Sequence, residues 1–227
     1  MDTSTDALYL VTQFIQGPLV WVAFIVFFGG LLVQSVRIFS LTRAAQLPTA
    51  RMMACQPSPD LPKKNWGHRL SRSILGVSPA TTLVTSVFHV CLFVTPLFLL
   101  GHNILLDNAF GIHLISFSEA TSDILTRIYL LCGLYFLTRR LFLPRVRVIT
   151  TVYDYAMLFL AMAPFLTGLL AYHQIFTYKP LIVLHILCGE IMLMAVPFTK
   201  FVHMMFFFIF RFFVVSEYSL GIGNRNW

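Results

Sequence analysis

The sequence predicts an all-α membrane protein, a bundle of five transmembrane helices, from three observations. The chain of 227 residues is 58% hydrophobic and has a mean hydropathy of +0.80. Only 11% of its residues are charged, far fewer than the surface of a soluble domain needs. Apolar runs of roughly 20 residues recur along the chain, and each is long enough to span a hydrocarbon core of about 30 Å. A soluble globular fold is therefore excluded.

The apolar runs predict one membrane domain over residues 1–227, with spans at 18–36, 81–102, 123–138, 151–172 and 181–205. The third span is short and needs flanking residues to cross a bilayer. The segment 37–80 holds five prolines and no strong periodicity, which predicts irregular chain. The last apolar run continues beyond its span and is too long for one straight crossing, so Pro197 is a candidate kink.

Lysines and arginines are distributed unequally between the predicted loops. Fourteen of them lie in segment 37–80, in loop 139–150 and in the C-terminal portion, whereas only Arg127 and Lys179 fall on the other side. Because cytoplasmic loops are enriched in basic residues, this predicts an outer N-terminus, a cytoplasmic loop 37–80 and a cytoplasmic C-terminus. No basic stretch carries interleaved aromatic residues on a soluble surface, so the net charge of +7 does not indicate nucleic-acid binding.

The cysteines exclude two kinds of redox site. They stand alone, without any CxxC pair or CxxCH motif, at positions Cys55, Cys91, Cys132 and Cys188. The chain therefore has no thiolate set for an iron–sulfur cluster and no attachment motif for covalent c-type haem. A redox metal bound to this chain must be held by histidine.

Four histidines lie on the second and fifth predicted spans. His185 and His203 are eighteen residues apart, which is five turns of an ideal helix, so both project from one side near opposite membrane faces. His89 and His102 bracket the second span. With the predicted topology, His102 and His185 share the outer depth, and His89 and His203 share the inner depth. Two such pairs predict two haems, each with two axial imidazoles.

An alternative interpretation is a cofactor-free membrane anchor with structural histidines, because a single histidine within a span is more often packed or hydrogen-bonded than a ligand. The thirteen residues from His89 to His102 turn an ideal helix by about 1300°, which leaves the two rings roughly 140° apart. A kink at Pro96 would change that phase. A transporter is disfavoured, because the chain has no clear internal repeats.

Further residues are candidates for function. Arg127, at the start of the third span, is placed to bind a haem propionate or a quinone oxygen, or else extends to the interface without a ligand. Gly101 lacks a side chain and would let a quinone ring approach the neighbouring histidine. Glu190 lies inside the last span, as a proton relay or as a protonated, hydrogen-bonded group. His113 and His173 lie outside the spans and are expected to have surface or interface roles.

Several motifs resemble the membrane cytochrome b (gamma) subunit of the respiratory nitrate reductase family. Residues 139–147 read RRLFLPRVR, close to the family's RRLFSPRVR loop. The segment 184–203 begins with Leu-His, ends with VPFTKFVH and keeps the family's histidine spacing of eighteen. The first histidine pair is also similar, with a spacing longer by three. An aspartate and a glycine of the family's fourth helix correspond to Asp154 and Gly168.

The chain as a whole is more similar to integral b-type subunits of transmembrane redox complexes in sulfate-reducing bacteria, such as the high-molecular-weight cytochrome c complex. The resemblance implies two noncovalent b haems, a quinone site near the outer haem with menaquinone as a candidate, and a cytoplasmic iron–sulfur partner. A periplasmic multihaem cytochrome c and other membrane subunits are further candidate partners. We therefore expect an electron-transfer subunit of an oxidoreductase complex in the bacterial inner membrane.

Overall fold

The computed structural model describes residues 3–54 and 78–208, and the regular structure within these ranges is helical. Five helical segments in this part of the chain are long and apolar enough to cross a membrane. They are Tyr9–Leu41, Pro79–Phe98, Glu119–Phe142, Val152–Tyr172 and Tyr178–Phe198. The prediction of an all-α, multi-pass membrane protein with five spanning helices is confirmed, and contact with a lipid bilayer follows from it.

The orientation of the termini stays a prediction. Six of the basic residues that support it lie outside the described residues, at Lys63, Lys64, Arg69, Arg72, Arg211 and Arg225. The chain forms two compact units, Met1–Lys63 with Glu190–Trp227 and Lys64–Gly189, and each is described by itself.

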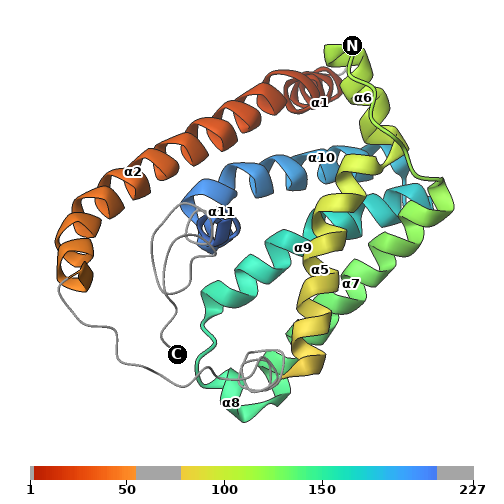
Figure 1. Ribbon diagram of the computed structural model, residues 1–227. Helices are drawn as coiled ribbons and strands as arrows, with labels where there is room; N and C mark the ends of the chain where they lie inside the picture. Colours follow the sequence, from red (N-terminus) through yellow and green to blue (C-terminus); the bar gives the residue numbers. More distant parts are fainter. Residues whose placement is uncertain (1–2, 55–77, 209–227) are drawn as a thin grey trace. The chain divides into compact units, whose positions relative to one another are not determined.

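The unit Lys64–Gly189 is built around three packed helices, with α7 lying against the other two (Figure 1). These are α5 (Pro79–Phe98), α7 (Glu119–Phe142) and α9 (Val152–Tyr172). Two short helices lie in their connections, α6 (Leu100–Phe110) and α8 (Pro144–Arg147). The residues of α10 (Tyr178–Ala195) up to Gly189 complete this unit.

Tyr129 of α7 lies at the centre of this unit's core. Its ring is 0% exposed and stacks on Phe88 of α5 and on Phe165 of α9, with centroid distances of 4.4 and 3.9 Å. Its hydroxyl donates to a backbone carbonyl of α9 at 3.0 Å, which satisfies the polar atom in apolar surroundings. A Cβ at Gly133 would collide with the side chain of Met162, so α7 and α9 approach closely there. One aromatic stack and one close contact thus hold the three helices together.

Local hydrogen bonds explain where α7 and α9 begin. The hydroxyl of Ser118 accepts from the backbone N–H of Thr121 at 3.2 Å, an N-cap for α7. The carboxylate of Asp154 accepts from the backbone N–H and the hydroxyl of Thr151 at 2.9 and 2.8 Å, a capping box for α9. Asp154, which matches an aspartate of the resembled family, therefore has a structural role at this helix end.

The predicted second span is not one helix, because the chain is extended at Leu99 (φ −69°, ψ 127°) between α5 and α6. Pro96, three residues earlier, lacks an N–H and disrupts the helical hydrogen-bond ladder. The returning chain stabilises the break, since the N–H of Phe117 donates to the carbonyl of Phe98 at 2.8 Å. His102 consequently lies on α6, and the ideal-helix phase that separated it from His89 by about 140° does not apply.

The other unit contains α1 (Thr3–Phe14), the π-helical turn η1 (Ile15–Leu19) and the long α2 (Val20–Ala54). The prediction of irregular chain from residue 37 is wrong as far as Ala54, and residues 55–77 lie outside the described ranges. Leu, Ala, Arg and Met dominate this part of α2, and their helix propensity outweighs the single Pro48.

The same unit contains the end of the predicted fifth span. After α10 the chain forms the 3₁₀ turns η2 (Val196–Phe198) and η3 (Lys200–Val202) and then α11 (His203–Phe208). The prediction of one continuous helix over 181–205 is therefore wrong, because Thr199 is extended (φ −120°, ψ −174°). The eighteen-residue spacing cannot place His185 and His203 on one side, since they lie on separate helices. The predicted interruption is observed next to Pro197.

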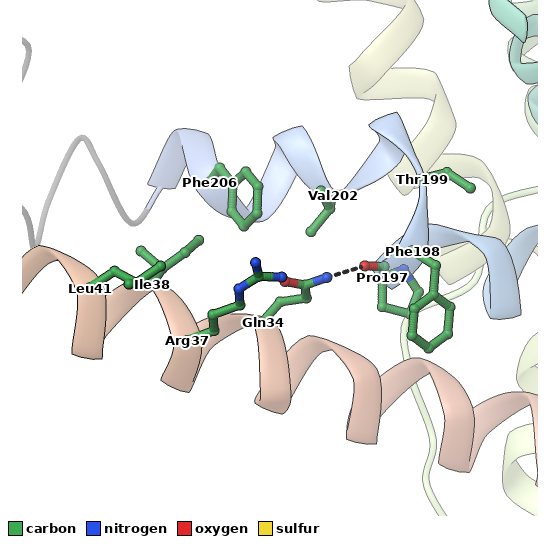
Figure 2. A pocket seen from close by; sticks show the side chains of 9 residues that line it. All are labelled: Gln34, Arg37, Ile38, Leu41, Pro197, Phe198, Thr199, Val202 and Phe206. Atoms are coloured by element: carbon green, nitrogen blue, oxygen red, sulfur yellow. Dashed lines mark hydrogen bonds between the residues drawn. The ribbon is translucent and has the colours of Figure 1, made fainter.

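A contact with α2 stabilises this turn. Gln34 donates to the carbonyl of Pro197 at 2.9 Å (Figure 2), and Gly30 leaves room for the proline ring. A Cβ at Gly30 would lie 2.6 Å from that ring, so the glycine is required for the close approach.

Candidate functional site

The structure brings two of the four predicted ligands together. His102 of α6 and His185 of α10 are neighbours, with ring centroids 6.0 Å apart and ring planes 20° from parallel. Two imidazoles bonded to opposite sides of one metal at about 2 Å per bond have centroids about 6 Å apart. The predicted outer pair therefore has the separation that a shared metal requires.

Each ring of this pair is held by a backbone carbonyl at Nδ1. Nδ1 of His102 donates to the carbonyl of Pro96 at 2.9 Å, and Nδ1 of His185 donates to the carbonyl of Pro164 at 2.8 Å. Because a carbonyl only accepts, Nδ1 carries the proton in each neutral ring, and Nε2 keeps its lone pair. Within the described residues, neither Nε2 has a hydrogen-bond partner. This arrangement is typical of histidines that bind metals.

The interruption of α5 explains why His102 finds this acceptor. In a continuous helix the carbonyl of Pro96 would accept from the N–H of Leu100, but the extended Leu99 prevents that bond. The carbonyl is left available at the end of α5, and His102, in the first turn of α6, donates to it. The proline, the break and the orientation of the imidazole thus belong to one local structure.

Gly168 of α9 provides the space in which His185 lies. A Cβ at Gly168 would be 2.9 Å from Cε1 and 3.0 Å from Nδ1 of the ring, closer than real contacts allow. The buried hydroxyl of Thr167 lies 3.5 Å from the same Nδ1. The sequence motif identified Gly168 only through the family resemblance, and it did not indicate this contact.

The donor set fits a haem better than a metal held by side chains alone. Among residues 3–54 and 78–208, no three His, Cys, Asp or Glu side chains gather in a group that could hold a metal ion. Structural zinc sites use four such ligands. A metal between His102 and His185 would take its remaining ligands from outside these side chains, and a porphyrin is one group that supplies them.

The predicted inner ligands, His89 and His203, belong to different units, and their pairing stays a prediction. In each of them a backbone carbonyl accepts a hydrogen bond from Nδ1, as in the outer pair. Nδ1 of His89 donates to the carbonyl of Thr85 at 2.7 Å, and Nδ1 of His203 donates to that of Lys200 at 2.6 Å. His203 is exposed and lines a hollow of about 520 Å³ together with Lys200, Val202 and Phe206.

Arg127 belongs to a polar cluster where α7 begins and α9 ends. Its guanidinium is 2.7 Å from Oδ2 of Asp123 and 3.1 Å from Nε2 of His173. The same Nε2 lies 2.9 Å from Oδ1 of Asp123. Close by, Tyr172 donates to Glu119 at 3.3 Å. Sequence reasoning omitted Asp123, although its four-residue spacing from Arg127 on a helix was a usable signal.

The two other candidates have simple environments. Gly101 is exposed, and a Cβ there would meet nothing within 4 Å, so no described neighbour requires a glycine. Glu190 is 4% exposed on α10, and neither carboxyl oxygen has a hydrogen-bond partner within the described residues. An ionised carboxylate in such a place is costly. The hydrogen bond that one interpretation of Glu190 requires is not formed within the described residues, and its role as a proton relay stays a prediction.

The unit that contains α2 has a separate pocket of about 330 Å³ (Figure 2). Arg37 and Gln34 lie on its α2 side, and the turn around Pro197 together with Phe206 forms the other side. None of the predicted site residues lines this pocket.

A protein of Nitratidesulfovibrio vulgaris (strain Hildenborough) is 32% identical to this chain over 218 residues, which cover 94% of this chain and 96% of the relative. The two proteins belong to one family. The likeness within this family extends over nearly the whole of both chains and is not confined to one pair of helices. No family model matches the chain.

Proposed function

We propose that this protein is a di-haem b-type membrane subunit of a respiratory redox complex. The observation that carries the proposal is the pair formed by His102 and His185. The rings have the separation of two axial ligands, both Nδ1 atoms are fixed by carbonyls, and both Nε2 atoms lack a partner within the described residues. A haem with two imidazole ligands supplies one-electron transfer and leaves no coordination position for oxygen.

In this proposal the chain's own residues fix the ligands before a haem arrives. The carbonyls of Pro96 and Pro164 set the tautomer in which Nε2 is the donor atom to the metal. Gly168 lets His185 lie against α9, so the ring cannot turn freely. A preorganised pair of rings reduces the rearrangement that accompanies each change of iron charge.

His89 and His203 would hold the second haem, nearer the cytoplasm in the predicted topology. Their shared Nδ1 anchors support this assignment, together with the family resemblance of the segment that ends in His203. Two haems at two depths would carry electrons through the bilayer of the bacterial inner membrane.

The proposed partners lie on either side of that bilayer. The outer redox partner is a quinone such as menaquinone or a periplasmic multihaem cytochrome c, and the inner partner is a cytoplasmic iron–sulfur subunit. The arginine-rich segment 139–147 supports docking of an acidic surface on the predicted cytoplasmic side. The apolar face of α2 supports contact with lipid or other membrane subunits, because Phe28, Leu32 and Val33 are exposed.

A reduced-minus-oxidised visible spectrum of the purified chain tests the proposal. We expect the bands of b-type haem, two haems per chain by haem extraction, and a low-spin signal of bis-imidazole iron in electron paramagnetic resonance. A chain purified from haem-replete cells without any haem band would contradict the proposal and leave the membrane anchor as the explanation of the histidines.

A further inference from the structure

In the cluster of Asp123, Arg127 and His173, one ring nitrogen of the histidine lies near both a hydrogen-bond acceptor and a hydrogen-bond donor. Nε2 of His173 lies 2.9 Å from Asp123 Oδ1 and 3.1 Å from the Arg127 guanidinium. The carboxylate accepts only, and its other oxygen already receives the guanidinium at 2.7 Å. The guanidinium only donates, so a bond from it would require a lone pair on Nε2, whereas Oδ1 requires a proton there. The contact with Oδ1 is the shorter of the two and favours the tautomer in which Nε2 donates to the carboxylate.

That tautomer leaves a basic nitrogen directed away from the cluster. With the proton on Nε2, Nδ1 of the neutral ring keeps its lone pair. Within the described residues Nδ1 of His173 has no hydrogen-bond partner, and the side chain is 33% exposed, whereas that of Asp123 is 14% exposed. A carboxylate behind an imidazole orients the ring and stabilises the imidazolium that forms when the ring takes a proton.

His173 and the proposed haem ligand His185 are both positioned by the C-terminal part of α9. His185 lies against α9 at Gly168, and His173 follows Gly168 by five residues at the end of the same helix. Five residues correspond to about 7.5 Å along a helix axis. His173 therefore lies about 7.5 Å along the helix axis from the glycine that contacts His185, just beyond the end of this spanning segment.

A base at this place distinguishes two classes of electron donor. A cytochrome that delivers an electron to a haem loses no proton, so it needs no base at the site of transfer. A lipid-soluble hydroquinone loses one proton with each electron and needs an acceptor within hydrogen-bond reach. Arg127 does not need to touch the substrate, because its charge is directed to Asp123.

We propose that His173, positioned by Asp123 and Arg127, is the proton acceptor for a lipid-soluble hydroquinone that reduces the haem held by His102 and His185. The inference rests on the proposed function and selects between its two outer partners.

The step balances as follows for each electron. The O–H bond of the hydroquinone breaks, its proton goes to Nδ1 of His173, and one electron goes to the ferric haem. His173 then releases the proton to water at the exposed side of the cluster, and the electron moves on to the second haem. A second round removes the other proton and electron and leaves the quinone.

A second histidine–carboxylate pair provides a matched control. Nε2 of His113 lies 3.1 Å from Asp107, but the His113 side chain is 79% exposed and solvated. Among the described residues no guanidinium contacts this pair, in contrast to the Asp123 cluster. His113→Ala removes an outer-end imidazole without touching the proposed acceptor.

The experiment measures haem reduction in the purified full-length protein by two donors. Menadiol, a naphthohydroquinone, gives electrons with protons, and reduced methyl viologen gives an electron alone. His173→Gln keeps an N–H donor toward Asp123 but has no basic nitrogen. We expect it to slow reduction by menadiol about 100-fold, the usual range for loss of a general base, and to leave the haem spectrum and the viologen rate unchanged.

Added imidazole supplies a further readout that a structural role would not change. In His173→Ala, imidazole should restore a substantial part of the menadiol rate and have no effect on the viologen rate. In His113→Ala, both donors should reduce the haem at the wild-type rate.

Three results with the His173 variants would overturn the inference. They are a wild-type menadiol rate in His173→Gln, an equal loss of rate with both donors, and a failure of imidazole to rescue His173→Ala. A wild-type protein with two haems that viologen reduces and menadiol does not would also overturn it while the proposed function stands. A wild-type protein without haem would instead refute the proposed function.

Discussion

His185 packs against α9 and His173 caps the end of that helix, yet the two histidines use opposite ring nitrogens. His185 donates from Nδ1 to a backbone carbonyl, and His173 contacts a carboxylate through Nε2. His102 follows the first pattern and His113 follows the second. The hydrogen-bond partner of a histidine, more than its position in the sequence, thus decides which ring nitrogen keeps a lone pair for a metal or a proton.

The two patterns also differ in charge. A carbonyl is neutral, so it fixes a neutral ring whose free nitrogen suits a metal. A carboxylate is anionic, so it stabilises a ring that has taken up a proton. The first arrangement is suited to holding an electron carrier and the second to accepting protons.

The sharpest test of this difference is the removal of one ring of each kind. His185→Ala should abolish the outer haem and reduce the haem content from two per chain to one, because the iron needs both axial imidazoles. His173→Ala should keep both haems. Haem extraction together with the low-spin resonance signal measures the outcome, and two full haems in purified His185→Ala would refute the ligand assignment.

Cysteine labelling from each side of the membrane tests on which side the proposed haem ligands and the Asp123 cluster lie. Phe110, after the α6 helix that carries His102, and Ile149, between α8 and α9, are 50% and 76% exposed. In a background with Cys55→Ser, Phe110→Cys should react with an impermeant maleimide from outside, and Ile149→Cys only after the membrane is opened. The reverse pattern would place His102 and His185 at the cytoplasmic side and invert the proposed path of electrons.

A smaller change would sharpen the comparison at His185 without removing the ring. Gly168→Ala places a methyl group 2.9 Å from the imidazole, so the ring must shift and its bond to Pro164 must weaken. We expect partial occupancy of the outer haem or a changed low-spin signal.

Gly29→Ala is the matched control, since a Cβ there meets nothing within 4 Å. Equal haem content and identical spectra for both alanine variants would show that the contact with Gly168 does not determine how His185 is held.

The smallest expected effect comes from a core substitution that should lower the stability of the bundle without changing the haem sites. Tyr129→Phe deletes a buried hydroxyl that donates to an α9 carbonyl and keeps the aromatic stack. Its loss should cost about 1 kcal/mol of unfolding free energy, which is a few degrees in the thermal midpoint. Haem content should not change, and a loss of haem equal to that of His185→Ala would contradict this prediction.

The length of apolar runs was enough to predict the spanning helices but not their interruptions. The fourth span, predicted at 151–172, is observed at Val152–Tyr172. The third extends over Glu119–Phe142, beyond the predicted 123–138, because its ends carry charged and polar residues that hydropathy leaves out. Pro96 and Pro197 marked the two broken spans, but a proline does not show whether a helix bends or ends. At Leu99 the helix ends, and this end is stabilised by a hydrogen bond from the N–H of Phe117 to the carbonyl of Phe98, nineteen residues earlier.

The candidate site was predictable in its residues and not in its supporting contacts. The paired histidines could be found from spacing, yet the spacing argument for His203 failed because α10 ends at Ala195. His185 is 21 residues from the carbonyl that fixes it, and His173 is 50 residues from its carboxylate. Such contacts depend on which helices become neighbours, and no local pattern encodes that choice.

The support of His185 by α9 has a consequence for the biogenesis of the protein. The ring is carried by α10, but its acceptor, Pro164, and its space, at Gly168, belong to the preceding helix. While α10 is being synthesised and inserted, the imidazole has neither its tautomer nor its orientation fixed. The proposed haem pocket would form only after α9 and α10 have packed together. Haem would then bind only after the bundle is complete, so bound haem would indicate that α9 and α10 have packed correctly.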